Sequence, residues 1–112
     1  MKTASAFSLL PDHAAAAMSA AGDLVAALGP KIDLVVVYTT EQRARPEMLE
    51  ALRAAIPGAQ IVGGTSCGGV MTEAGFHASP DGALGLFGIA DPDGSYGVGS
   101  CGAADGSFAA GA

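Results

Sequence analysis

Apolar and polar positions in the first half of the chain predict strands that alternate with helices. A continuous β-branched run over residues 34–38 indicates a strand covered on both faces. Residues 3–9 are small and alternate only weakly, which predicts an edge strand. Ile61-Val62 forms a third short strand before a glycine-rich segment. The pattern therefore predicts a βαβαβ opening.

The two segments between these strands carry helical spacing and the residues that begin and end helices. Asp12 is a suitable N-cap for a first helix that ends at Gly29-Pro30. Pro46 begins a second helix, which Pro57-Gly58 ends. In the first helix, steps of three and four residues predict one buried stripe made of Ala14, Met18, Ala21, Val25 and Leu28.

The second half of the chain follows a different pattern, because residues 63–112 hold 14 of the 17 glycines. Residues 83–90 and 95–100 read as two strands, and Asp91-Pro92-Asp93-Gly94 between them is a typical turn sequence. We therefore expect an antiparallel hairpin. Residues 105–112 resemble a cap and the first turn of a helix. The expected fold is α/β: a βαβαβ opening followed by a glycine-rich antiparallel β hairpin, in one domain over residues 1–112 that is incomplete at its C-terminal end.

Charge and hydropathy exclude several classes of function. The net charge is −6, and residues 54–112 contain no lysine or arginine. A nucleic-acid backbone or an anionic membrane surface requires clustered cations, so neither is an expected partner. No apolar run reaches the roughly 18 residues that span a bilayer, and the N-terminus lacks the apolar core of a signal peptide. The expected location is the cytoplasm.

The cysteines and histidines of the sequence do not have the spacing of a metal-binding site. Cys67 and Cys101 lie 34 residues apart, without a CxxC motif or a histidine at ligand spacing, so two reduced thiols are expected. His13 lies at the start of the first helix and His77 lies in a loop. An axial haem ligand is the functional interpretation of His77, while a solvated loop histidine is the ordinary one. No cofactor is otherwise predicted.

The segment Gly63-Gly64-Thr65-Ser66-Cys67-Gly68 is the main candidate site. Its last five residues fit the G-x-S-x-G nucleophile elbow, which would make Ser66 a hydrolase nucleophile. That motif needs a following helix and a distant histidine, and His77 is only eleven residues away. The segment also lacks the lysine of a phosphate-binding loop. Small residues after a buried strand do expose backbone N–H groups, so a ligand-binding loop and a tightly packed turn remain equal alternatives. No residue is assigned a catalytic role.

Two arginines near the second helix offer a further candidate contact. Arg43 and Arg45 lie just before the residue that begins this helix. A guanidinium group there could clamp a carboxylate, although a solvated pair of arginines is the commoner arrangement.

The order of these segments resembles the N-terminal part of the FIST domain (F-box and intracellular signal transduction). The resemblance rests on the strand at 34–40, the helix at 49–56 and the segment 57–68, and it extends over about residues 4–104. The family pattern usually has an acidic residue where this chain has Gly69. The resemblance implies a sensory module of a signalling protein that binds a small ligand such as an amino acid, and for some relatives haem.

The sequence is therefore consistent with three functions. The first is a non-enzymatic sensory module that binds a small molecule, with haem kept open as the ligand. The second is a structural or assembly subunit that keeps the frame without a ligand site. The third is a small serine hydrolase that uses Ser66. We also expect either a homo-oligomer or a second protein chain, because the hairpin at 83–100 would otherwise leave an apolar face or a free edge exposed.

Overall fold

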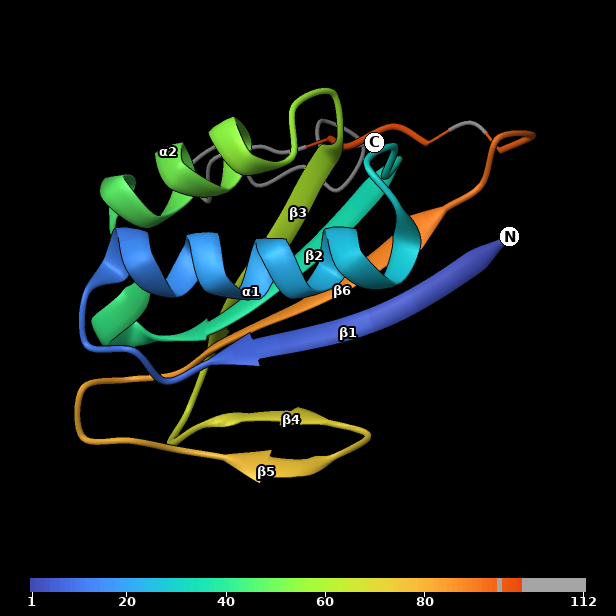
Figure 1. Ribbon diagram of the computed structural model, residues 1–112. Coiled ribbons are helices and arrows are strands. Elements are labelled where there is room, and N and C mark those ends of the chain that lie inside the picture. Colours follow the sequence, from blue (N-terminus) through green and yellow to red (C-terminus); the bar gives the residue numbers. More distant parts are fainter. Residues whose placement is uncertain (95, 100–112) are drawn as a thin grey trace.

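A four-stranded mixed sheet carries two helices on one face and a small hairpin against the other (Figure 1). The computed structural model describes residues 1–94 and 96–99. The elements are β1 (Lys2–Ser8), α1 (His13–Leu28), β2 (Leu34–Thr40), the 3₁₀ turn η1 (Glu41–Arg43), α2 (Pro46–Ala55), β3 (Gln60–Ser66), β4 (Val70–Thr72), β5 (Gly75–His77) and β6 (Leu84–Ala90). The predicted βαβαβ opening is thus confirmed.

The strand order explains why both helices lie on the same face. The sheet has the order β1-β6-β2-β3, so the chain moves in one direction from β1 to β2 and then to β3. Crossovers between parallel strands are right-handed, and two such crossovers in one direction place both helices on one side. β6 lies between β1 and β2 and runs antiparallel to both. β1 is an edge strand, as predicted.

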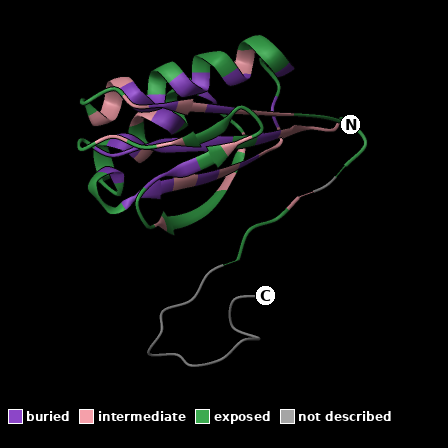
Figure 2. Cartoon of the chain, turned by 90° about the horizontal axis from the view of Figure 1, so that it is seen from below, coloured by how far each residue is buried: buried purple, intermediate pink, exposed green. Residues whose placement is uncertain are grey.

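The core lies between the helices and the sheet (Figure 2). Asp12 caps α1 as expected, because its side chain accepts a hydrogen bond from the backbone N–H of Ala15. The predicted stripe is partly wrong, since Met18 is 61% exposed. Small residues instead face the sheet and let the helix lie close to it. The buried positions of α1 are Ala16, Ala17, Ala20, Ala21, Leu24 and Leu28.

The prediction that β2 is covered on both faces is only partly confirmed. Val35 and Val37 are buried beneath the helices, whereas Val36 between them is only half-buried. On the face without helices, Val36 pairs with Val62 of β3 and Phe87 of β6, which are both exposed. The continuous apolar run therefore belongs to a central strand with one well-covered face.

The prediction of a hairpin over residues 83–100 is wrong. β6 forms where a strand was expected, but it pairs with β1 and β2 instead of the segment that follows it. Residues 96–99 are not a strand, and residues 95 and 100 lie outside the described residues. The expected turn at 91–94 does form, with a hydrogen bond of 3.1 Å from Gly94 N–H to the Asp91 carbonyl. The expected helical turn at 105–112 also lies outside the described residues.

A short hairpin, β4-β5, forms over residues that carried no strand signal. Its side chains reach the face of the sheet that has no helices: Glu73 accepts a hydrogen bond from the Ser5 hydroxyl, and the His77 ring stacks on Phe7 at 3.5 Å. Burial, and to a lesser degree the charge of Glu73, raises the pKa of Tyr38 on the same face. Close packing in the hairpin requires Gly69, because a Cβ there would lie 2.5 Å from the His77 carbonyl oxygen.

A fully buried arginine joins three segments near the carboxyl end of β2. The Arg43 guanidinium donates to the carbonyl oxygens of Leu10, Pro11 and Gly82, the last two at 3.1 and 3.3 Å. Burial lowers the pKa of Arg43, while Asp81 and Asp12 oppose that shift. The arginine proposed as a carboxylate clamp is therefore a structural tie between the loop before α1, η1 and the loop before β6.

Replacing Arg43 should destabilise the fold strongly. Arg43→Met removes the donor to these three carbonyl oxygens, of which that of Gly82 belongs to a buried residue, so we expect a loss of about 3 kcal/mol in the free energy of unfolding. Arg43→Lys should recover part of this loss, because an ammonium group still donates to some of these oxygens. Denaturant titration checks both values. The exposed Arg53→Met is the control and should change stability by less than about 0.5 kcal/mol; equal effects at positions 43 and 53 would contradict the assignment.

Substitution of two adjacent glycines in β3 by alanine should change the stability of the protein in opposite directions. A Cβ on Gly63 would lie 1.6 Å from the Val37 carbonyl oxygen, whereas a Cβ on Gly64 has no atom within 4 Å. We expect Gly63→Ala to destabilise the protein by more than about 2 kcal/mol through strain between β2 and β3. Gly64→Ala should be neutral or stabilising by up to about 1 kcal/mol. Thermal unfolding of the two variants measures both changes in stability. Equal stability of the Gly63 and Gly64 variants would contradict the prediction.

Candidate functional site

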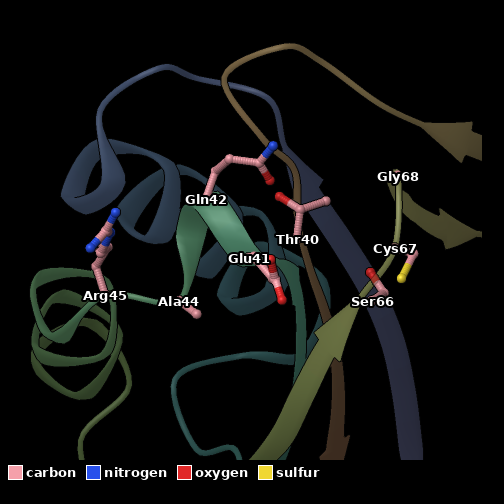
Figure 3. A pocket seen from close by; sticks show the side chains of 8 residues that line it. All are labelled: Thr40, Glu41, Gln42, Ala44, Arg45, Ser66, Cys67 and Gly68. Atoms are coloured by element: carbon pink, nitrogen blue, oxygen red, sulfur yellow. The ribbon is translucent and has the colours of Figure 1, made fainter.

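A cavity opens at the carboxyl ends of the parallel strands β2 and β3, where ligands commonly bind in α/β sheets (Figure 3). Its volume is about 620 Å³, within the range of small-molecule sites. One side is built by the segment from the end of β2 to the start of α2, and the other by the last residue of β3 and the turn after it. The lining residues are Thr40, Glu41, Gln42, Ala44, Arg45, Ser66, Cys67 and Gly68.

The first side of the cavity is fixed by contacts that hold the end of β2. Thr40 is buried, its backbone N–H donates to the Ala83 carbonyl at 3.0 Å, and its hydroxyl accepts from the Ala83 N–H at 3.0 Å. The hydrogen bonds of the buried Arg43 side chain then hold η1 in place. Pro46 begins α2 immediately after Arg45. The segment 41–45 is therefore held at both ends while its exposed side chains face the cavity.

The second side is a tight turn. The Ser66 hydroxyl donates to the Gly69 carbonyl at 2.7 Å, and Gly69 N–H donates to the Cys67 carbonyl at 2.9 Å. Gly68 has φ +76°, a left-handed conformation that favours glycine. Cys67 is exposed and carries a free thiol. This turn presents a hydroxyl and a thiol to the cavity.

The lining carries opposite charges. Glu41 and Arg45 are both exposed, and both line the cavity together with the amide of Gln42. In Figure 3, Arg45 lies at one end of the lining and Ser66 and Cys67 at the other, with Glu41 between them. A carboxylate, a guanidinium, an amide and hydroxyls around one space can bind a ligand that itself has both a negative and a positive group.

The predicted site segment is divided between two places. Ser66, Cys67 and Gly68 line the strand-end cavity, as a ligand-binding loop would. Gly63, Gly64 and Thr65 belong to β3, where they pair with Val37, Tyr38 and Thr39 of β2. These three residues line a separate groove beside α2. The loop was placed too early because the glycines were read as a break, although backbone pairing continues through them.

Sequence reasoning found Arg45 but missed the other lining residues on the same side of the cavity. These residues lie at the end of β2, the strand that the sequence identified most clearly, and in the segment after it: Thr40, Glu41, Gln42 and Ala44. The rule that ligands bind at carboxyl ends of parallel strands, applied to that strand as well as to β3, would have found them.

The structural context of a nucleophile elbow is not present around Ser66. The motif requires a strand, a sharp turn and a helix, whereas β3 is followed by the hairpin β4-β5. The Ser66 hydroxyl donates to a backbone carbonyl, and the Nε2 atom of His77 pairs with the Thr72 hydroxyl at 2.9 Å. Ser66 and His77 therefore do not form a nucleophile–base contact.

The surroundings of His77 do not fit an axial haem ligand. Its ring is stacked on Phe7 and its Nε2 atom is engaged by Thr72. Over residues 1–94 and 96–99, no group of three or more histidine, cysteine or acidic side chains could hold a metal ion. Cys101 lies outside these residues. Within the same ranges, no helix has the length and apolar character needed to cross a membrane.

Comparison with known proteins identifies the family. No curated protein and no solved structure matches the chain. The family model of the FIST N domain matches residues 33–110. The matched region begins just before β2 and includes every residue that lines the candidate cavity, whereas β1 and α1 precede it. The match covers well over half of the chain, and it confirms the resemblance drawn from the sequence. The chain therefore belongs to the FIST N domain family, a family of sensory domains in signal transduction.

Proposed function

We propose that this chain is a non-enzymatic sensory module that binds an α-amino acid in the cavity at the carboxyl ends of β2 and β3. The observation that carries the proposal is the pair of opposite charges, Glu41 and Arg45, in the lining of one cavity of about 620 Å³. The family supports a sensory role, and the cavity supports a ligand of this size and charge.

Each group of an amino acid has a matching group in the lining. The Arg45 guanidinium offers two parallel donors to the ligand carboxylate, and the Glu41 carboxylate accepts from the ligand ammonium. The Gln42 amide and the Ser66 hydroxyl are available for a polar ligand side chain. The polar lining and exposed charges favour a hydrophilic amino acid over a large apolar one.

The lack of an assembled catalytic set supports binding without turnover. The Ser66 hydroxyl donates to a backbone carbonyl, and the described residues give it no histidine partner. Its role in the proposal is that of a hydrogen-bonding group in the lining. A haem-dependent sensor draws no support from the surroundings of His77.

Ligand binding should depend on the two charged lining residues. We expect calorimetric titration with the free amino acids to identify at least one ligand, and Arg45→Gln to weaken its binding about tenfold by removing the carboxylate contact. Glu41→Gln should weaken binding of the free amino acid. It should leave the affinity for the N-acetylated amino acid unchanged, because that form has no ammonium group. Lys2→Gln, on β1 at the far edge of the sheet, is the control and should leave affinity unchanged.

The same assays separate the competing functions. A protein that unfolds cooperatively and binds none of the amino acids would favour the structural subunit. Ester turnover that Ser66→Ala abolishes would establish the hydrolase. A Soret band that His77→Ala shifts would establish haem binding and contradict the reading of His77 given above.

Gly68 and Gly64 give a second test of where the ligand binds. Gly68 lines the cavity in a left-handed conformation, whereas Gly64 lies within β3 and outside the cavity lining. We expect Gly68→Val to weaken ligand binding at least tenfold and Gly64→Ala to leave it unchanged. Loss of affinity in the Gly64 variant alone would instead place the ligand beside α2.

A further inference from the structure

The outer edge of β3 presents backbone groups that no strand pairs within residues 1–94 and 96–99. β3 is the last strand in the order β1-β6-β2-β3, and Gln60 N–H donates to the Asp33 carbonyl at 2.9 Å, on the β2 side. The N–H and C=O of one residue point to the same side of a strand, and this side alternates along the chain. The N–H and C=O groups of Ile61, Gly63 and Thr65 therefore point away from the sheet.

This edge also lacks the features that usually protect an edge strand. Natural proteins place lysine, proline or a bulge on such edges to prevent pairing with another chain. β3 has no charged residue and no proline, and Gln60 and residues 62–65 are exposed. β1, at the opposite edge, begins with Lys2. The β3 edge is thus the one suited to receive another strand.

An apolar groove runs beside this edge on the helix side. Its volume is about 540 Å³, and it lies between the start of α2 and β3. Pro46, Met48 and Leu49 of α2 and Ile61 of β3 provide apolar surface in the lining. A strand added to β3 would point every second side chain toward this side of the sheet. The groove therefore suits small apolar side chains at alternate positions of the added strand.

Positive charge lies at both ends of the edge. Arg45 lines the groove at the carboxyl end of β3, and Arg53 lines a cavity with Gln60 and Ile61 at the amino end. Both arginines are exposed in a chain of net charge −6. Two copies paired antiparallel through β3 would bring Arg45 of one copy beside Arg53 of the other, which is repulsive. An added strand with an acidic residue at each end would satisfy both arginines.

We propose that the β3 edge is a docking site for an extended peptide segment of another protein, with alternating apolar residues between acidic ends, which binds as a fifth strand of the sheet. Backbone hydrogen bonds supply affinity, while the groove and the two arginines supply selectivity. The proposal shares Arg45 with the strand-end cavity, but it does not require that the cavity binds an amino acid. It gives the sensory module a surface for a protein partner, which the strand-end cavity does not provide.

The first test uses a peptide probe on the full chain. The probe is an N-acetylated heptapeptide amide with aspartate at both ends and alternating valine and threonine between them. We expect binding, together with slower hydrogen exchange at the amides of Ile61, Gly63 and Thr65 only. The amides of Gln60, Val62 and Gly64 face β2 and should not change. The same peptide with lysine ends should bind at least fivefold more weakly. Equal binding of both peptides, protection at other amides or no binding would overturn the proposal.

Three variants complete the test. Thr65→Pro removes an outward N–H without breaking a bond to β2, so it should abolish peptide binding while circular dichroism stays native. Arg53→Gln should weaken binding about fivefold, and the matched Lys2→Gln should not. Arg53 lies outside the strand-end cavity, so amino-acid affinity should be unchanged in this variant. A dimer that forms without peptide and dissociates in Thr65→Pro would show that a second copy occupies the edge, which would overturn the peptide proposal.

Discussion

The burial of Arg43 is the constraint on which the rest of the structure depends. A guanidinium without exposed surface must find acceptors, and here the acceptors are backbone carbonyls from the loop before α1 and the loop before β6. Because Arg43 ends η1, the same contacts fix the segment that forms one wall of the strand-end cavity. Arg43 therefore fixes the geometry of the cavity although it does not line it. This arrangement leaves the side chains of Glu41 and Arg45 exposed in the lining while Arg43 holds the backbone between them.

The sequence predicted the βαβαβ opening because each of its elements carries a local signal: Asp12 caps α1, Pro46 begins α2, and the valines of β2 form one run. The partners of β6 could not be predicted, since its glycines and apolar residues suit a hairpin as well as a central strand. What decides between them is the fit of Gly88 beneath Leu24 and of Gly85 beneath the Tyr38 ring, where a Cβ would lie 2.8 and 2.2 Å from these side chains. Such contacts join distant parts of the chain and have no periodicity.

The candidate site was predictable to a similar extent. The small residues after β3 pointed to a loop, and Ser66, Cys67 and Gly68 do form a turn at the cavity. Glu41 and Gln42 are ordinary polar residues in the sequence and gain significance only because η1 places them opposite that turn. A Cβ at Gly69 would lie 2.5 Å from the His77 carbonyl oxygen of β5, so the backbone approaches β5 too closely here for the acidic side chain that the resemblance led us to expect.

The insertion of β6 between β1 and β2 has a consequence for how the chain reaches its fold during synthesis. Lys2 pairs with Ala90 and Ser8 with Leu84, so β1 is synthesised long before its partner β6, the last described strand. At roughly 5–20 residues per second, several seconds separate the synthesis of β1 from that of β6. During this interval β2 and β3 can pair, but α1 has only part of its apolar surface covered. Contacts of such long sequence separation slow folding, so we expect the pairing of β6 with β1 to be a late step that completes the cover of the alanine-rich helix.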